Sequence, residues 1–324
     1  MSTESKDKHY QASTNTKGEF VRKSSQFHDE VTADGSSGFK AEANRYHLYV
    51  SLACPWAHRT LIVRKLKGLE NVISLNVVDW LMEGKGWKFD NEGKPGTTPD
   101  TVNNFGYLSE VYALSEPEYD GRWTVPVLFD KLQKKIVCNE SSEIIRMLTR
   151  EFNEFCPTLE QKELDLYPVE LRKDIDEMND WVYPNINNGV YRCGFATSQE
   201  AYDNAVTQLF EALDKLEEIL STRRFLVGKQ FTEADVRLFT TLVRFDLVYH
   251  GHFKCNKMRI IDYPNIWGYT RDIYQIPGVA ETCNFGHIKK HYMQSHRNIN
   301  PHGIVSVGPD LDFSAPHRRE ALGQ

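Results

Sequence analysis

The chain has 324 residues, 40% of them hydrophobic and 26% charged, a composition typical of globular rather than disordered proteins. Its net charge of −6 argues against a general nucleic-acid binder, which needs a concentrated basic face. No run approaches the ~20 apolar residues that span a bilayer, and the polar N-terminus lacks the apolar core of a signal peptide. These properties predict a cytoplasmic protein of two domains, with neither nucleic acid nor membrane as a partner.

The first 40 residues are polar but contain Phe20, Phe27 and Phe39, so we expect an N-terminal arm, residues 1–40, that docks rather than a free tail. A β-rich run at 46–51 then predicts a strand.

A helix is predicted to follow this strand. It begins at Pro55, whose missing N–H is no loss in a first helical turn, and ends at Gly68. Residues 72–78 predict a second strand, and the three elements form a β–α–β unit with a right-handed crossover.

An irregular insertion at about 80–122 follows, rich in Gly, Asp, Asn and Pro, with one short helix expected around 103–113. Residues 124–129 and 135–138 predict a hairpin, and the position of Pro126 favours a cis Val125–Pro126 bond. Strand, helix, strand and hairpin together predict a thioredoxin-like α/β domain over residues 41–156.

The remainder of the chain is predicted to be all-helical, because apolar residues recur at helical spacing through residues 157–295. Thr232 and Asp235 have the spacing of a capping box that begins a helix from Glu233 to about Val248. Residues 296–324 form a tail that we expect to fold back over this domain near the site.

Six cysteines are spread along the chain: Cys54, Cys138, Cys156, Cys193, Cys255 and Cys283. They form no Cys-x-x-Cys pair and no cysteine–histidine spacing that builds a zinc site, so we expect no metal. A disulfide framework is not expected at this length in the cytoplasm. Most of the six are therefore expected to be small, buried and inert.

Cys54 differs because it lies between a predicted strand and the first turn of a helix. Free N–H groups and the positive end of the helix dipole favour its thiolate, although an inert cysteine filling the junction is the alternative for this location alone. Position 57, where disulfide oxidoreductases carry a second cysteine, is Ala57, so an outside thiol such as glutathione must resolve a mixed disulfide. His58 is expected to support the site indirectly or to face solvent rather than to bind a metal.

Several residues near the predicted hairpin suit glutathione, which carries two carboxylates and an ammonium group. A helix start at Ser141 and Ser142 offers hydroxyl and N–H groups to a carboxylate, although such a start is also an ordinary cap. Glu140 suits the ammonium group and Arg122 a second carboxylate. The backbone of Val125 suits the cysteinyl amide.

Five segments together resemble the Xi-class glutathione transferases, which are the glutathionyl-hydroquinone reductases. They are Tyr46-His-Leu-Tyr-Val-Ser-Leu-Ala-Cys-Pro-Trp-Ala-His-Arg-Thr-Leu61, Asn139-Glu-Ser141, Asn187-Asn-Gly-Val-Tyr-Arg-Cys-Gly-Phe-Ala196, Glu233-Ala-Asp-Val-Arg-Leu238 and Asn300-Pro-His-Gly-Ile304. The resemblance extends from about Phe20 to Pro309. It implies a thioredoxin-like domain followed by an all-helical glutathione transferase domain, a homodimer, and glutathione as co-substrate.

The reaction that the resemblance implies converts a glutathionyl-hydroquinone and glutathione into hydroquinone and glutathione disulfide, through a mixed disulfide of Cys54 with glutathione. The implied glutathione contacts are Trp87, Arg122, Val125, Glu140 and Ser141.

Three tyrosines complete the implied site. Tyr191 corresponds to the proton donor, while Tyr249 and Tyr292 correspond to phenols near the thiol that hold it ionised and orient the ring. A phenol suits an aromatic substrate because it joins a hydrogen-bond donor to a flat apolar body, although any one of these tyrosines is alternatively a packing residue. Trp123, beside the presumed glutathione strand, has no assigned role.

Two other functions remain open from the sequence. An Omega-like thiol transferase or dehydroascorbate reductase needs the same Cys54 and glutathione site but no tyrosine cluster. A non-catalytic module of this fold used for assembly is a second alternative, although such a module would not require Cys54 or the Glu140–Ser141 pair. The physiological quinone is not determined, since a pocket of tyrosines and loops accepts many flat rings.

Overall fold

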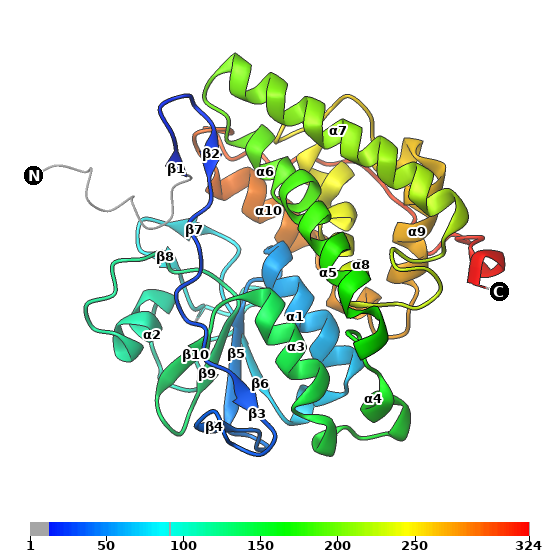
Figure 1. Ribbon diagram of the computed structural model, residues 1–324. Helices are drawn as coiled ribbons and strands as arrows, with labels where there is room; N and C mark the ends of the chain where they lie inside the picture. The colour runs from blue at the N-terminus through cyan, green and yellow to red at the C-terminus, as the bar shows by residue number, and fades with distance from the viewer. Residues whose placement is uncertain (1–12, 91, 324) are drawn as a thin grey trace, which may run out of the picture. The chain divides into compact units, whose positions relative to one another are not determined.

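The computed structural model of the protein describes residues 13–90 and 92–323 (Figure 1), so the first twelve residues of the predicted arm lie outside it. The chain divides into two compact units, called here the sheet unit and the helical unit. Within the described range, the sheet unit comprises residues 23–164 and 282–295, and the helical unit comprises residues 13–22, 165–281 and 296–323.

The division departs from a simple order along the chain at two places. Residues 13–22 belong to the helical unit, because the backbone of Gly18 accepts the N–H of Thr197 at 2.9 Å. Residues 282–295 belong to the sheet unit, because this segment bonds to the insertion there, as in the 2.7 Å contact of His291 Nδ1 with the carbonyl oxygen of Trp80.

A four-stranded mixed sheet in the order β10-β9-β5-β6 forms the centre of the sheet unit. β5 (Tyr46–Val50) pairs in parallel with β6 (Ser74–Val77) and antiparallel with β9 (Val127–Asp130), which pairs antiparallel with β10 (Lys135–Cys138). Every residue of β5 is buried, as expected for a strand covered on both faces. The predicted strands and hairpin are confirmed, with shifts at their ends.

Two helices, α1 (Pro55–Leu66) and α3 (Ser141–Arg150), pack together beside this sheet (Figure 1). Pro55 occupies the first turn of α1 as predicted. Gly68 ends this helical segment in the left-handed region with a φ of 65°, and a Cβ there would come within 2.7 Å of Pro157.

The insertion contains a hairpin of β7 (Met82–Glu83) and β8 (Gly86–Trp87) and the helix α2 (Leu108–Ser115). The prediction that this helix starts near residue 103 is wrong. The carboxylate of Asp100 accepts backbone N–H groups from the next few residues, Phe105 among them, and this local turn competes with the helix.

The sheet unit also contains several short elements and one helix from late in the chain. These are β3 (Val31–Thr32), β4 (Phe39–Lys40), η2 (Leu69–Asn71), η3 (Asn153–Phe155), α4 (Leu159–Glu163) and α10 (Phe285–Ser295). The arm follows the edge of the sheet, since Asp29 donates its N–H to the carbonyl oxygen of Val137 at 3.0 Å.

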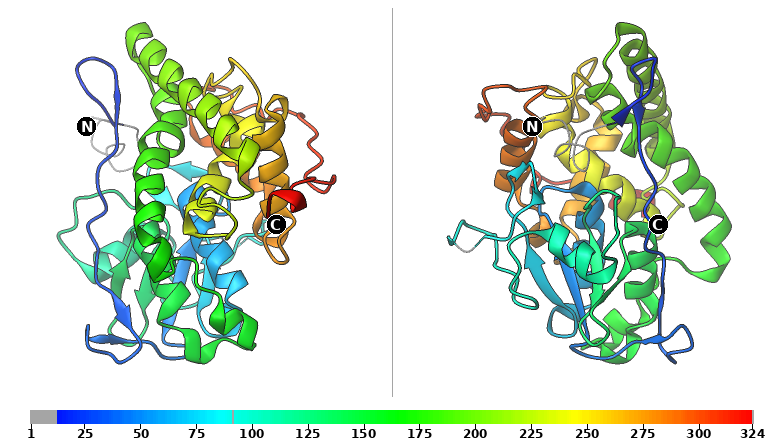
Figure 2. Two further views of the ribbon diagram at one scale, coloured as in Figure 1. Left: turned by 45° about the vertical axis from the view of Figure 1, so that its right-hand side comes forward. Right: turned by 90° about the vertical axis from the view of Figure 1, so that its left-hand side faces the viewer.

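The helical unit contains a succession of helices. These are η4 (Val169–Leu171), α5 (Arg172–Val182), η5 (Tyr183–Asn187), α6 (Gly189–Gly194), α7 (Gln199–Thr222), α8 (Glu233–Arg244), η6 (Phe245–Tyr249), η7 (Ile260–Asp262), α9 (Pro264–Tyr274) and η9 (Glu320–Gly323). The 24-residue helix α7 runs along this unit (Figure 2). In the described part of the chain, none of the helices has the length and apolarity to cross a membrane.

The capping box at the start of α8 is confirmed, because Thr232 donates its N–H to Asp235 Oδ2 at 2.8 Å. The predicted single helix to Val248 instead changes at Phe245 into the π-helical turn η6, so that its hydrogen-bonding pattern is wider.

The C-terminal tail packs within the helical unit. Gln275, just after α9, donates to the carbonyl oxygen of Phe313 at 2.9 Å, and the Phe313 ring lies 5.1 Å from that of Trp267. Arg319 donates to the carbonyl oxygen of Leu220 at the same distance of 2.9 Å. The tail therefore folds back over helices of its own unit.

Candidate active site

Cys54 is the N-cap residue of α1, where β5 leads into the helix. Its carbonyl oxygen accepts the N–H of His58 at 3.0 Å, which is the first bond of the helix. The side chain is partly exposed, and Sγ lies 3.5 Å from the carbonyl oxygen of Val125. The structure thus places a reachable sulfur at the positive end of a helix dipole.

The segment before β9 brings Val125 to this sulfur. The Val125–Pro126 bond is cis, as predicted, and Val125 is buried. The carbonyl oxygen of Arg122 accepts the hydroxyl of Tyr119 at 2.9 Å and the N–H of Thr124 at 3.1 Å. These bonds hold the backbone segment before β9, which contains both Arg122 and Val125, two predicted glutathione contacts.

Glu140 is the N-cap residue of α3, so the cap is this carboxylate rather than the predicted serines. Its Oε1 accepts the N–H and the hydroxyl of Ser142, both at 3.0 Å, and its Oε2 accepts the hydroxyl of Ser25 at 3.0 Å. Burial acts to raise the pKa of Glu140, but the Ser142 N–H and the charge of Arg59 outweigh it and hold this pKa below its usual value. Glu140 is therefore a partly buried carboxylate suited to an ammonium group.

Ser141 follows directly and is buried. Its hydroxyl accepts from Nη1 of Arg59 at 3.3 Å and lies 3.4 Å from Glu140 Oε1. A carboxylate and a hydroxyl at the start of α3 thus lie beside the guanidinium group of Arg59 from α1.

Trp87 and Tyr292, far apart in the sequence, lie on segments that contact each other. The ring of Trp87 stacks on His291 of α10, with 4.9 Å between the centroids and 27° between the planes. Tyr292 is the next residue and only 1% exposed. Trp123, which had no assigned role, lies against the same hairpin, where a Cβ on Gly86 would come within 3.0 Å of its ring.

His58 has neighbours that the sequence did not reveal. Its Nε2 lies 2.8 Å from the hydroxyl of Thr282 and 3.8 Å from Sγ of Cys283. The solvent-facing alternative for His58 is wrong, because its side chain is fully buried. Within the described residues, no group of three or more His, Cys, Asp or Glu side chains could hold a metal ion.

Tyr191 of α6 and Tyr249 of η6 are neighbours in the helical unit, with 6.0 Å between their ring centroids. Phe253 stacks on Tyr249 at 5.4 Å and meets Tyr191 edge-on at the same distance. The structure thus joins two of the three predicted tyrosines in one aromatic cluster, suited to flat rings. Tyr292 belongs to the sheet unit.

Sequence reasoning missed two arm residues that contact Tyr191. Phe20 stacks on it with 6.3 Å between the centroids, and the guanidinium carbon of Arg22 lies 4.7 Å from the centroid of the Tyr191 ring. The available signal was that the family resemblance begins at about Phe20, well before Cys54.

The buried cysteines differ from Cys54. Burial raises the pKa of Cys138 well above its usual value, and Sγ lies 3.3 Å from Glu143 Oε2. Burial and a hydrogen bond with Cys193 likewise raise the pKa of Cys255. These thiols are held in their protonated, unreactive form.

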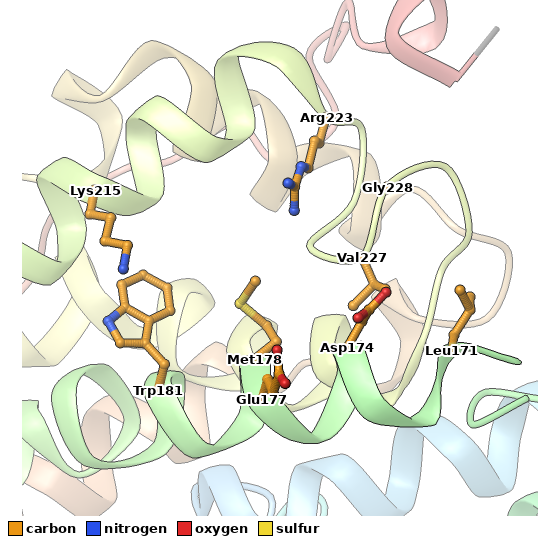
Figure 3. Close-up of a pocket in the computed structure, with 9 residues that line it drawn as sticks. All are labelled: Leu171, Asp174, Glu177, Met178, Trp181, Lys215, Arg223, Val227 and Gly228. Atoms are coloured by element: carbon orange, nitrogen blue, oxygen red, sulfur yellow. The ribbon is translucent and has the colours of Figure 1, made fainter. Parts of the chain in front are cut away.

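A pocket of about 510 Å³ opens in the helical unit between α5, α7 and the loop that follows α7 (Figure 3). Asp174 and Glu177 project from α5, while Lys215 and Arg223 face them from the other side. The ammonium group of Lys215 lies 4.8 Å from the ring centroid of Trp181. The lining contains no cysteine or tyrosine and none of the predicted site residues, so this pocket lacks the chemistry of the reaction.

Comparison with known proteins identifies both halves of the chain. The glutathione S-transferase N-terminal domain matches residues 53–151, and the corresponding C-terminal domain matches residues 199–272. Glutathionyl-hydroquinone reductase YqjG of Escherichia coli K12 is 56% identical over 311 residues, which cover 94% of this chain and 93% of that protein. Glutathionyl-hydroquinone reductase PcpF of Sphingobium chlorophenolicum is 51% identical over 294 residues, covering 90% of each chain.

Solved structures show the same relationship. The glutathione-bound structure of E. coli YqjG has a TM-score of 0.88 and covers 91% of this chain and 96% of its own. The Xi glutathione transferase of Phanerochaete chrysosporium, 51% identical, has a TM-score of 0.90 and covers 94% and 96%. The predicted combination of a thioredoxin-like domain and a helical domain is therefore confirmed. The chain belongs to the Xi class of glutathione transferases, the enzyme family of the glutathionyl-hydroquinone reductases.

Proposed function

We propose that the protein reduces S-glutathionyl-hydroquinones with glutathione, yielding the hydroquinone and glutathione disulfide. The observation that carries this proposal is the partly exposed sulfur of Cys54 at the N-terminus of α1, with Ala57 where a second cysteine would stand. A lone thiolate of this kind forms a mixed disulfide that a second, external thiol must release.

The reaction has two balanced steps. The Cys54 thiolate attacks the sulfur of the conjugate, so that a disulfide bond forms while the bond between sulfur and the aromatic carbon breaks. The electron pair of that bond stays on the ring carbon, which takes up a proton. A second glutathione thiolate then attacks the glutathione sulfur of the mixed disulfide, which releases glutathione disulfide and restores the Cys54 thiolate.

Glutathione is held by the residues around this sulfur. The partly buried carboxylate of Glu140 takes its ammonium group, while Ser141 at the start of α3 and Arg122 take its carboxylates. The backbone of Val125 pairs with its cysteinyl amide, and Trp87 lies against it.

The tyrosines serve the aromatic half of the substrate. Tyr191 donates the proton to the ring carbon, because a phenol gives up a proton without needing a charged donor. Tyr249 and Tyr292 orient the ring and help to hold the thiol ionised.

Mass spectrometry after addition of a glutathionyl-hydroquinone tests the mechanism. A glutathione adduct is expected on Cys54 and is expected to disappear in Cys54→Ser. An adduct on a different cysteine would contradict the mechanism. The absence of any adduct would contradict it as well and would favour a non-catalytic module.

A single variant separates this function from an Omega-like thiol transferase. Tyr191→Phe is expected to lower reduction of the conjugate about a hundredfold or more, as for loss of a general acid, while exchange with an ordinary mixed disulfide persists. Unchanged reduction of the conjugate in Tyr191→Phe favours the Omega-like function.

Family membership also supports a homodimer. Light scattering on the purified protein is expected to give twice the mass of the 37.5 kDa chain, and the mass of a single chain contradicts this assignment.

A further inference from the structure

The N-terminal arm brings a permanent positive charge to the face of Tyr191. The guanidinium carbon of Arg22 lies 4.7 Å from the Tyr191 ring centroid and 5.2 Å from that of Phe20. Its Nε donates to Oδ1 of Asn188 at 2.7 Å, three residues before Tyr191 on the same helical stretch. This bond fixes the plane of the guanidinium group relative to α6.

The arm is held in place by its own hairpin. β1 (Ser13–Thr14) pairs with β2 (Phe20–Val21), and the turn between them docks on the connection from α6 to α7 (Figure 2). The carbonyl oxygen of Gly18 accepts the N–H of Thr197 at 2.9 Å, and that of Lys17 accepts the hydroxyl of Ser198 at 2.7 Å.

Gly18 is required by this docking. Its φ is +82°, and a Cβ there would come within 2.8 Å of Thr197 Oγ1 and 2.9 Å of the Ser198 nitrogen. The position of Arg22, four residues later, thus follows from a defined contact rather than from a loose segment.

We propose that Arg22 is a positioning residue that orients the Tyr191 phenol and stabilises the negative charge that forms on it. This inference rests on the proposed function, in which Tyr191 gives its proton to the ring carbon. As the proton leaves, the phenol becomes a phenolate, and a cation against the ring face stabilises that charge more than it stabilises the neutral phenol.

The surroundings of Tyr191 favour this role. The rings that contact it are Tyr249 of η6, Phe253 shortly after η6, Phe20 of the arm and Phe195 at the end of α6. Among the described contacts of the Tyr191 ring, Arg22 is the charged residue, and Tyr249 is an uncharged residue that can titrate. Arg22 and Tyr191 are themselves partly exposed, but the buried rings of Phe20 and Phe253 beside them exclude part of the water that would screen the charge.

Four variants test the role of the arm. Arg22→Gln is expected to lower kcat for conjugate reduction about tenfold with little change in KM, and Arg22→Lys to recover most of the loss because it keeps the charge. Gly18→Ala is expected to reproduce the Arg22→Gln effect with Arg22 intact, because it displaces the hairpin. Lys23→Gln, which removes an exposed arm charge, serves as the control and is expected to leave kcat unchanged.

A spectroscopic titration provides the readout that a purely structural role would not move. The phenolate absorbance of Tyr191 is obtained as the difference between the protein and Tyr191→Phe, and then again in the Arg22→Gln background. Loss of the guanidinium group is expected to move this ionisation, and the basic limb of the kcat profile, upward by about one pH unit. Equal thermal unfolding of Arg22→Gln and the unchanged protein shows that the fold is retained.

The outcomes separate the inference from the proposed function. An unmoved titration in folded Arg22→Gln overturns the role of Arg22, even if Tyr191→Phe abolishes conjugate reduction. Full activity of Tyr191→Phe instead overturns the donor role of Tyr191. The role of Arg22 as its positioning residue is then overturned too, whatever the titration shows.

Discussion

The sulfur of Cys54 lies 3.5 Å from the carbonyl oxygen of Val125. A carbonyl oxygen only accepts hydrogen bonds, so this contact favours the protonated thiol, whereas the N-terminus of α1 favours the thiolate. The two influences act in opposite directions on one partly exposed atom. Both influences come from the backbone, one from the start of α1 and the other from the segment before β9.

Cys54 is expected to react faster than Cys138 with a small alkylating agent. The Cys138 thiol is buried and its pKa is raised, while Cys54 is partly exposed at a helix N-terminus. Brief treatment of the folded protein with iodoacetamide, followed by peptide mass spectrometry, is expected to show a rate difference of about tenfold or more. Equal labelling of the two cysteines contradicts this prediction.

Glu140→Gln is expected to raise the KM for glutathione about tenfold, because a charge-assisted hydrogen bond to the ammonium group is lost. Steady-state kinetics with varied glutathione measures the change. Glu143→Gln is the matched control, since Glu143 lies on the same helix but its carboxylate pairs with the half-exposed His28. A similar KM shift in both variants would mean that only the overall charge matters.

The pH dependence of stability is expected to contain a contribution from Asp235. Burial raises the pKa of this carboxyl to about 6, although it accepts hydrogen bonds from the N–H groups of Leu226 and Thr232 and from the hydroxyl of Tyr269. The folded state therefore binds more protons than the unfolded state between about pH 4 and about pH 6. Stability from this group falls as pH rises through that window, by at most about 3 kcal/mol.

Asp235→Asn removes this ionisation while keeping an oxygen that can accept hydrogen bonds at the cap. Urea unfolding at several pH values is expected to give the variant a less negative slope of unfolding free energy against pH in that window. Identical slopes for the two proteins would show that Asp235 does not titrate there.

Gly194→Ala is expected to disturb the aromatic cluster of the helical unit. A Cβ at Gly194 would overlap the ring of Phe253, which is fully buried and packs on Tyr191 and Tyr249. Overpacking of this kind costs about 1–3 kcal/mol, and conjugate reduction is expected to fall as well.

Gly189→Ala provides the control in the same helix, because its nearest neighbour, a methyl group of Leu209, is at an ordinary 3.4 Å. Thermal unfolding and turnover of this variant are expected to match those of the unchanged protein. A loss as large as that of Gly194→Ala would mean that any side chain on α6 is harmful, independently of Phe253.

The sequence by itself determined the features that depend on neighbours in the chain. The turn from β5 into α1 with Cys54 at its N-cap, and the capping box of Thr232 and Asp235, are set within a few residues and were predicted correctly. Local prediction was wrong where another interaction competed with the helical pattern. The Asp100 carboxylate delayed α2, and a π-helical turn replaced the last part of the helix that begins at Glu233.

Only the tertiary structure decided which distant segments meet. The stacking of Trp87 on His291, the contact of His58 with Cys283, and the guanidinium of Arg22 over Tyr191 each join segments far apart in the chain. Spacing and periodicity carry no information about such pairs, because they depend on where the folded chain returns to itself. Local capping and patterning thus specified the position of Cys54, the proposed nucleophile, while packing between remote segments specified the surroundings of the proposed site.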